Sequence, residues 1–162
     1  MLIGVVSDTH IPSRARRIPP RVIAGLRGVD LILHAGDLTE LSVLAELRAI
    51  APVEAVVGNV DSLEVMEALP RTRILDVDGR RIGLVHGDGP GPSTPARVLR
   101  AFAGIPVDAI VFGHSHAPLC EHRDGLLLFN PGSPTDKRRQ PRASYGLLRV
   151  EGEELTAEIV YI

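Results

Sequence analysis

The chain has 162 residues and a net charge of −2 at pH 7, with 44% hydrophobic and 23% charged residues. These values indicate one domain, residues 1–162, and they exclude a disordered chain or a general attraction to nucleic acid. The single cysteine excludes an internal disulfide framework, and the apolar start is too short for a signal peptide or a membrane span, so we expect a cytoplasmic protein with no membrane partner.

The first half of the sequence alternates between strand and helix patterns. Short branched apolar runs predict buried strands, and apolar residues at helical spacing predict the helices between them. The predicted strands are residues 2–7, 30–34 and 53–57, and helices are predicted to begin near residues 19, 41 and 61. In the third helix Asp61 precedes Glu64 by three residues, which is the spacing of a capping box. Such alternation is typical of a parallel sheet covered by helices.

The second half carries hairpin signals. Asp78-Gly79 and Asp124-Gly125 are two-residue turn sequences between strand-like runs. We expect strands at residues 73–77, 80–85, 108–112, 119–123 and 126–129, and a helix over residues 95–103. The last two segments, 144–150 and 155–162, are expected to pair with each other. A parallel half followed by an antiparallel half predicts two sheets packed face to face, with helices outside.

Short polar motifs follow apolar runs at five places in the chain. Ligands of open α/β sheets bind beyond the carboxyl ends of the strands, so we expect these motifs to meet at one crevice. Their carboxylate, amide and imidazole groups, without any thiolate, favour manganese, iron, zinc, nickel or cobalt. The motifs are Ser7-Asp8-Thr9-His10, His34-Ala35-Gly36-Asp37, Gly58-Asn59-Val60-Asp61, His86-Gly87-Asp88 and Gly113-His114-Ser115-His116.

The number of ligand groups suits two metal ions better than one tetrahedral centre. Asp8 and His10 are two residues apart and are expected to share one face of an extended segment, as are His114 and His116. Asp37 follows a glycine at a strand end and is the candidate for a carboxylate that bridges both metals. A lone Asp or His of this kind is usually structural, but burying so many unpaired polar groups together would be costly. The candidate ligands are Asp8, His10, Asp37, Asn59, His86, His114 and His116.

The ordered motifs of residues 8 to 116 resemble those of the calcineurin-like metallophosphoesterases. The short length and Gly58-Asn59-Val60-Asp61 are similar to the minimal bacterial and archaeal phosphodiesterase branch. This resemblance implies an α/β fold, a four-layer sandwich of two mixed β-sheets flanked by helices. It also implies one metal held by Asp8, His10, Asp37 and His116, and a second metal held by Asp37, Asn59, His86 and His114.

The activity implied by the resemblance is that of a dinuclear-metal-dependent phosphoesterase, with a phosphodiesterase favoured. A hydroxide bridging the two metals would attack phosphorus in line, without a side-chain nucleophile. Manganese is the favoured metal, and nickel, zinc, iron and cobalt are alternatives. The substrate would be a small phosphate ester, and a homodimer or homotetramer is implied. The residues expected to serve catalysis are Asp37, Asn59 and His86. His34 either orients Asp37 or a substrate oxygen or is a buried strand histidine bonded to the backbone, with the first favoured, and Asp61 either orients a ligand or caps its helix.

One position departs from the pattern of larger family members. Those members carry a histidine directly after the Gly-Asn pair, where this chain has Val60. That histidine is associated with protonating the leaving oxygen or stabilising the transition state, and valine can do neither. A general acid typically contributes about 10²–10⁴-fold to the rate. We therefore expect slow turnover of alkyl esters and faster turnover of diesters with acidic, aryl-like leaving groups.

Two basic clusters lie close to the motifs in sequence. Arginine binds phosphate through two parallel hydrogen bonds, so either cluster is a candidate for substrate contact, with a solvated face as the alternative. The cluster after His10 is the stronger candidate. Residues 87–95 are rich in Gly and Pro and would form an anion cradle or, more simply, a shaped connection. The clusters are Arg14, Arg16 and Arg17, and Lys137, Arg138, Arg139 and Arg142.

Two other functions remain open at this point. A non-catalytic interaction scaffold is one, because a eukaryotic retromer subunit has a similar fold, although a scaffold has no need of a complete ligand set. A nuclease acting on DNA or RNA is the other, and only the arginine clusters favour it. Aromatic residues are 3% of the chain, so stacking platforms for bases are scarce.

Overall fold

The branched apolar runs near the N-terminus form the parallel centre of one sheet, and the computed structural model describes all residues 1–162. This first sheet has the strand order β10-β9-β1-β2-β3. Its strands are β1 (Leu2–Val6), β2 (Leu31–His34), β3 (Val53–Ala55), β9 (Ser144–Glu151) and β10 (Glu154–Tyr161). The central strands are buried on both faces, as continuous apolar runs require.

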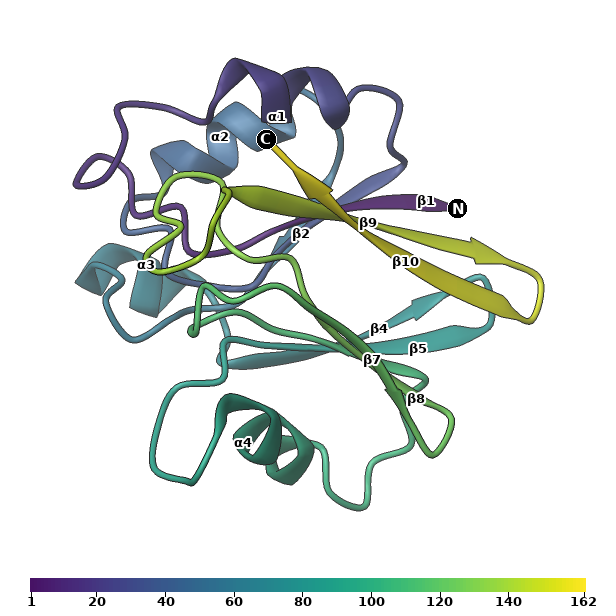
Figure 1. Cartoon of the computed structure of the whole chain (residues 1–162). Helices are drawn as coiled ribbons and strands as arrows, with labels where there is room; N and C mark the ends of the chain where they lie inside the picture. The colour runs from purple at the N-terminus through teal and green to yellow at the C-terminus, as the bar shows by residue number, and fades with distance from the viewer.

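The second sheet has the order β4-β5-β6-β8-β7 and faces the first (Figure 1). Its strands are β4 (Thr72–Val77), β5 (Arg80–Val85), β6 (Ala109–Val111), β7 (Leu119–Arg123) and β8 (Leu126–Asn130). The helices are α1 (Pro20–Gly25), α2 (Ser42–Arg48), α3 (Leu63–Ala68) and α4 (Thr94–Ala101). None of these helices is long and apolar enough to span a bilayer.

Both sheets are mixed, which confirms the predicted sandwich of two mixed sheets flanked by helices. The C-terminal hairpin does not stay with the antiparallel segments of the second half. Instead β9 pairs antiparallel with β1, with Leu2 opposite Arg149. In the second sheet, β6 lies between β5 and β8 and is parallel to both. Each sheet therefore has a parallel centre with antiparallel strands at one or both edges.

Aliphatic side chains from the two sheets fill the space between them. Ile3, Val5 and Leu33 of the first sheet pack with Val111 and Phe129 of the second, and all five are fully buried. Burying one such side chain stabilises the fold by about 1.5–3 kcal/mol. The two sheets are therefore held in a fixed relation, which also fixes the relative position of the loops at their ends.

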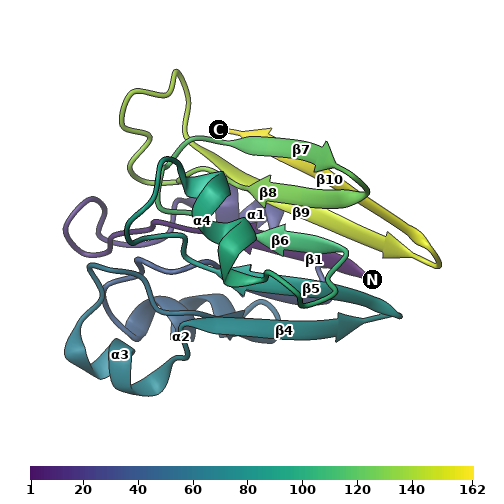
Figure 2. The ribbon, with the colours of Figure 1, turned by 90° about the horizontal axis from the view of Figure 1, so that it is seen from below.

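Helices cover the outer faces of both sheets. The helix α4 covers the second sheet, where Val98 and Phe102 pack on Ile110 and Leu128 (Figure 2). Gly83 of β5 lies directly beneath Phe102, since a Cβ atom at this position would come within 2.8 Å of the Phe102 ring. On the first sheet, α1 and α2 cover the other side of the sandwich.

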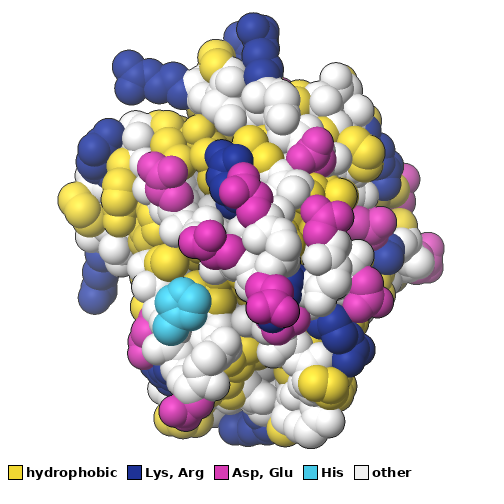
Figure 3. All heavy atoms as spheres, turned by 90° about the vertical axis from the view of Figure 1, so that its right-hand side faces the viewer, with side chains coloured by type: hydrophobic (Ala, Val, Ile, Leu, Met, Phe, Trp, Pro, Cys, Tyr) yellow, Lys and Arg dark blue, Asp and Glu magenta, His cyan; other side chains and the backbone are white.

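The parallel strands of both sheets end on the same side of the molecule, at the left in Figure 1. All five polar motifs lie at the ends of these strands or within three residues after them. The opposite end, seen in Figure 3, carries interspersed acidic and basic side chains, and histidine is scarce there. The fold therefore gathers the candidate ligands at one end, as the crevice rule for open sheets predicts.

Candidate metal centre

The motif after β1 turns sharply. Asp8 and His10 have φ angles of 55° and 44°, so the prediction that they share a face of an extended segment is wrong. Their backbone amides instead donate hydrogen bonds of 3.0 Å to the carbonyls of Gly36 and Asp37, in the loop after β2. Polar residues such as Asp and His tolerate this left-handed conformation better than branched ones. The turn brings the first two motifs together.

The two histidines after β6 are also left-handed, with φ angles of 69° at His114 and 57° at His116. The extended prediction is wrong for them too, and the consequence is that their rings diverge into different groups of ligand atoms. Each group has its ligand atoms within 4.8 Å of one another. The first group is Asp8, His10 and His116, and the second is Asp37, His86 and His114.

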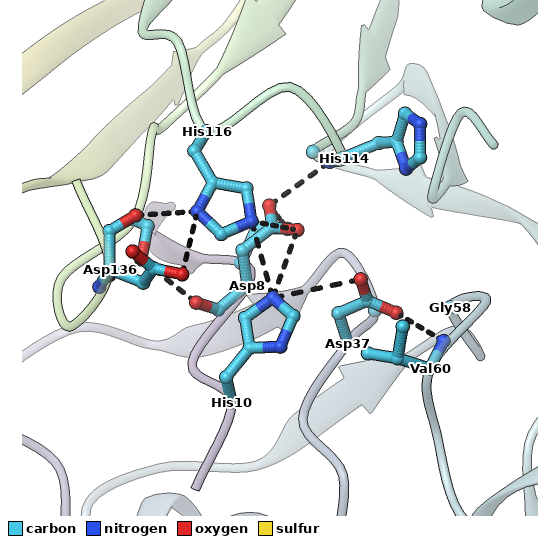
Figure 4. Close-up of polar contacts among 12 residues, drawn as sticks. Asp8, His10, Asp37, Gly58, Val60, His114, His116 and Asp136 are labelled. Carbon is cyan, nitrogen blue, oxygen red and sulfur yellow. Dashed lines mark hydrogen bonds and ion pairs between the residues drawn. The ribbon is translucent and has the colours of Figure 1, made fainter. Parts of the chain in front are cut away.

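In the first group, three ligand atoms converge on one point (Figure 4). The Nε2 atom of His116 lies 3.4 Å from Asp8 Oδ1 and 3.2 Å from His10 Nε2. All three residues are buried, with exposed fractions of 8% or less. Two imidazole nitrogens and a carboxylate oxygen facing one another form a donor set that borderline divalent metals accept.

The carboxylate of Asp37 lies between the two groups. Its Oδ2 atom is 3.7 Å from His10 Nε2 of the first group and 3.1 Å from His86 Nε2 of the second. Its other oxygen, Oδ1, accepts a hydrogen bond of 3.0 Å from the Val60 amide. That bond fixes the rotation of the carboxylate, so Oδ2 faces both groups at once.

One buried atom of the site has no hydrogen-bond partner, and this is Asp8 Oδ1. The other oxygen of Asp8 accepts from the Ser7 hydroxyl at 2.7 Å and from the His114 amide at 3.0 Å. Burial raises the pKa of Asp8 to about 7, against the opposing charge of His86. An orphaned carboxylate oxygen in the interior is costly unless a cation compensates it, so the site fits a metal ion.

The charges of the site compensate one another through His86. Burial would lower the pKa of His86, but the hydrogen bond to Asp37 and the charge of Asp8 raise it to about 9. Burial would likewise raise the pKa of Asp37, but the bond to His86 lowers it to about 2. Two carboxylates thus hold a proton on a buried imidazole. A divalent cation is the other species that satisfies the same charges.

Asn59 completes the second group with an amide oxygen. Its Oδ1 lies 3.1 Å from His86 Nε2 and 3.1 Å from His114 Nδ1. Asn59 is exposed and His114 is half-buried, so this side of the site opens to solvent. The structure therefore brings all seven predicted ligands to one place.

Asp61 does not cap α3. The N-cap of that helix is Ser62, whose hydroxyl accepts from the Val65 amide. The Asp61 carboxylate instead accepts hydrogen bonds from three backbone amides of the two ligand loops, namely those of Asp37, Thr39 and Gly58. The capping-box interpretation is therefore wrong, because the loops offer this buried carboxylate more donors than the helix start does.

His34 is completely buried beneath the site. Its Nε2 atom is 3.0 Å from the Thr9 hydroxyl, and its Nδ1 accepts from the Gly36 amide at 3.2 Å. Burial lowers its pKa to about 3, so the ring is neutral. The hydrogen bonds of the ring go to Thr9 and Gly36 and not to the Asp37 carboxylate. His34 joins the first two motif loops to each other instead.

Sequence reasoning missed the segment of residues 130–136, which we call the clasp. The Ser133 hydroxyl donates to the Asp8 carbonyl at 2.8 Å, and the Thr135 hydroxyl donates to the Thr9 carbonyl at 2.6 Å. The clasp thus covers the first motif from the C-terminal part of the chain. A signal was present, because the polar and turn-forming run Asn130-Pro131-Gly132-Ser133 begins at the last residue of β8, a strand that is parallel to β6.

The clasp also reaches the motif after β6. The Asp136 carbonyl accepts a hydrogen bond from His116 Nδ1, which leaves Nε2 facing the site. The Asn130 side chain donates to the Gly113 carbonyl at 3.0 Å. Histidine ligands of metals typically bond a carbonyl or carboxylate through the other ring nitrogen, and that bond sets the ring's orientation.

The arginines near the site differ in how they are held. Arg14 forms an ion pair with Asp136 at 3.4 Å, and its neighbours Arg16 and Arg17 are exposed. Arg97 donates from Nε to the Gly87 carbonyl at 2.7 Å and from Nη1 to the Gly91 carbonyl at 3.2 Å. Residues 87–95 are thus a shaped connection, tied down by an arginine.

The chain folds into two mixed sheets, and carboxylate, imidazole and amide oxygen ligands gather at one end of both. This combination defines a metal-binding protein of the metallophosphoesterase fold. A family model described as the calcineurin-like phosphoesterase superfamily domain matches residues 1–153. The chain belongs to this superfamily, as the resemblance of its motifs predicts.

Relatives and solved structures agree with this assignment. A protein named probable metallophosphoesterase from Methanothermobacter thermautotrophicus is 45% identical over 99% of this chain and 92% of its own length. A phosphodiesterase of Methanocaldococcus jannaschii is 27% identical, covering 82% of this chain and 83% of that protein. The wild-type Vps29 of Entamoeba histolytica, solved in complex with Zn²⁺, superposes with a TM-score of 0.79 at 26% identity over 99% of both chains.

Proposed function

We propose that this protein is a dinuclear-metal phosphodiesterase. The observation that carries the proposal is the position of Asp37 Oδ2, which lies 3.7 Å from His10 Nε2 in one ligand group and 3.1 Å from His86 Nε2 in the other. One carboxylate oxygen facing two groups is the arrangement expected of a bridging ligand. The orphaned Asp8 Oδ1 supports the same conclusion.

The donor sets suit two cations that share one ligand. The first would be held by Asp8, His10, Asp37 and His116, and the second by Asp37, Asn59, His86 and His114. When bound, two divalent ions neutralise the phosphoryl oxygens and make water a stronger nucleophile at neutral pH. The remaining work falls to side chains of the protein, which hold and orient these ligands.

The hydroxyls of Ser7 and Thr9, in the first ligand motif, are not placed to attack phosphorus. Ser7 and Thr9 are fully buried, and their hydroxyls are hydrogen-bonded to Asp8 and His34. Water is therefore the nucleophile that the site supports. The ester oxygen leaves as an alcohol, and the phosphorus keeps the incoming oxygen.

The side chain that follows the Gly-Asn pair offers no proton donor to a leaving group. Val60 is 48% exposed beside Asn59, and only its backbone amide takes part in the site. A valine side chain supplies no proton, so a leaving oxygen that is already a weak base is favoured. This supports diesters with acidic, aryl-like leaving groups as the better substrates.

We propose manganese as the metal, with nickel, zinc, iron and cobalt as alternatives, since all accept nitrogen and oxygen ligands. The zinc complex of Vps29 supports zinc as the strongest of these alternatives. We further propose a cytoplasmic enzyme that acts on a small phosphate ester as a homodimer or homotetramer. Light scattering of the purified protein tests the oligomeric state.

A scaffold function is the second candidate, because the fold matches Vps29 over almost the whole chain. The ligand set favours the enzyme over the scaffold, since a purely structural surface has no use for an orphaned carboxylate oxygen between imidazoles.

A nuclease is the weaker alternative. Arg142 of the second cluster lies over the Tyr161 ring at 5.6 Å and bonds the Tyr161 carbonyl, so it is not directed to the ligands.

The test is a panel of phosphodiesters and monoesters assayed with manganese, nickel, zinc and magnesium. Asp37→Asn should lower turnover by more than about 100-fold, because loss of a residue that merely orients a ligand already costs about 10–100-fold. Asp124→Asn is the matched control, since Asp124 has a similar φ of 50° in an exposed turn. A wild-type protein that takes up no divalent metal and cleaves no ester would overturn the proposal.

A further inference from the structure

Left-handed backbone conformations are concentrated at the candidate metal centre. Non-glycine residues rarely adopt positive φ angles, and those that do are often held there for function. Nine do so here: Asp8, His10, Asp37, Thr39, Asp78, His114, His116, Asp124 and Arg138. Five are candidate ligands, Asp78 and Asp124 occupy hairpin turns, and Thr39 donates its amide to Asp61.

Arg138, like Asp78 and Asp124, occupies a turn, because the Gln140 amide donates a hydrogen bond of 2.9 Å to the Lys137 carbonyl, but no Asp-Gly signal marks this turn in the sequence. Its φ is 47°, although arginine is not a residue that favours this region. It follows the clasp, two residues after Asp136, whose carbonyl holds His116. The segment that orients a ligand of the first group therefore also sets the direction of the Arg138 side chain.

The guanidinium of Arg138 lies beside the loop that carries His114 and His116. Its Nη1 atom lies 3.5 Å from the backbone carbonyl of His114, a candidate ligand of the second group. The positive charge therefore lies next to the ligand loop after β6.

Arg138 differs from Arg14 and Arg97, the two bonded arginines near the site, because its charge is not engaged. Arg14 is paired with Asp136, and Arg97 bonds two carbonyls and a hydroxyl. Arg138 is exposed and has only the long contact to His114. An uncommitted guanidinium beside a phosphate-cleaving centre is suited to bind two phosphoryl oxygens at once.

We propose that Arg138 binds the phosphoryl group of the substrate at the mouth of the metal centre. This inference rests on the proposed function. It assigns substrate contact to one residue of the second basic cluster. The guanidinium stays protonated at any working pH, so it stabilises charge on phosphoryl oxygens and does not replace the proton donor missing at Val60. A dianionic monoester should depend on it more than a monoanionic diester.

The test compares Arg138→Gln with Arg139→Gln in the metal-loaded protein. Arg139 is the adjacent exposed arginine, which makes it a matched control for charge and position. Calorimetric titration with inorganic phosphate measures binding without turnover, and elemental analysis measures metal content. Arg138→Gln should weaken phosphate binding about 10–100-fold, and Arg138→Lys should recover part of the loss, because one charge remains without the bidentate geometry.

The outcomes separate this inference from the proposed function. Equal phosphate binding by both glutamine variants, in a protein that still cleaves esters, would overturn the role of Arg138 alone. Loss of metal from Arg138→Gln would also overturn it, because the residue would then support the ligands instead of the substrate. A larger rise in KM for monoesters than for diesters, confined to Arg138→Gln, would support it.

Discussion

The two halves of the metal centre use the same kinds of side chain but differ in how they are enclosed. The first, which we call the buried half, is covered by the clasp and consists of Asp8, His10 and His116. The second, which we call the open half, has an exposed amide and a half-buried imidazole and consists of Asn59, His86 and His114. The difference suggests a division of labour, in which the buried half retains its cation and the open half receives the substrate.

Burial alone does not explain this asymmetry. The buried half is assembled from three parts of the chain, because hydrogen bonds join the loops that follow β1, β6 and β8. The open half lacks a comparable cover, and the segment after Asn59 presents Val60 to solvent instead. Three predictions test whether this difference governs metal binding and turnover.

The largest effect is expected from removing one histidine of each half. His114→Ala and His116→Ala should each lower turnover by more than about 100-fold, since each removes a candidate ligand. Only His116→Ala should also lower the free energy of unfolding, by about 2 kcal/mol or more, because it breaks a buried network that includes the clasp. Elemental analysis and urea unfolding measure the two effects.

His122→Ala is the control for this pair, since His122 lies exposed on β7. The comparison predicts that His114→Ala retains one metal per chain, held by the buried half. Equal losses of metal and of stability in both variants would show that the two halves behave as one unit.

The pH dependence of metal binding should separate the halves next. Protons compete with cations for ligands, so affinity rises with pH until each ligand has lost its proton. The pKa of about 9 at His86 extends this rise to about pH 9 for the open half. The pKa of about 7 at Asp8 ends it near pH 7 for the buried half.

Between these limits, the affinity of the open half should change about tenfold per pH unit, while that of the buried half is nearly constant. Chelator competition from about pH 6 to about pH 10 measures the metal affinity of each half. Calorimetric titration in two buffers counts the protons released on metal binding. Metal affinity that does not vary above about pH 7 at either site would contradict the assignment of His86 as a ligand that must lose a proton.

The smallest effect is expected from restoring an imidazole at the open mouth. Val60→His should raise the turnover of alkyl diesters by at least about tenfold, although by less than an evolved general acid supplies. Turnover of aryl diesters should change little, because their leaving oxygens need no proton. Leu63→His, at a position that is 71% exposed on α3, is the control. Unchanged alkyl turnover in a folded, metal-loaded Val60→His protein would refute the idea.

Much of the architecture was predictable, because local patterns carry it. Apolar runs and turn sequences located the strands to within about two residues, which is the usual uncertainty of element ends. The strand after residue 52 is shorter than predicted, Val53–Ala55 instead of 53–57. The placement of the C-terminal hairpin beside β1 was not predictable, because strand order depends on which faces bury each other.

The sequence alone determined the chemistry of the site, because ligand types and their positions after apolar runs are local properties. Only the tertiary structure decided which ligands meet: His10 lies 3.2 Å from His116 although 106 residues separate them. The same holds for the left-handed turns, for Asp61 bonding loop amides, and for the clasp that delivers Arg138. Each depends on two sheets ending at one edge, and no short stretch of sequence encodes that arrangement.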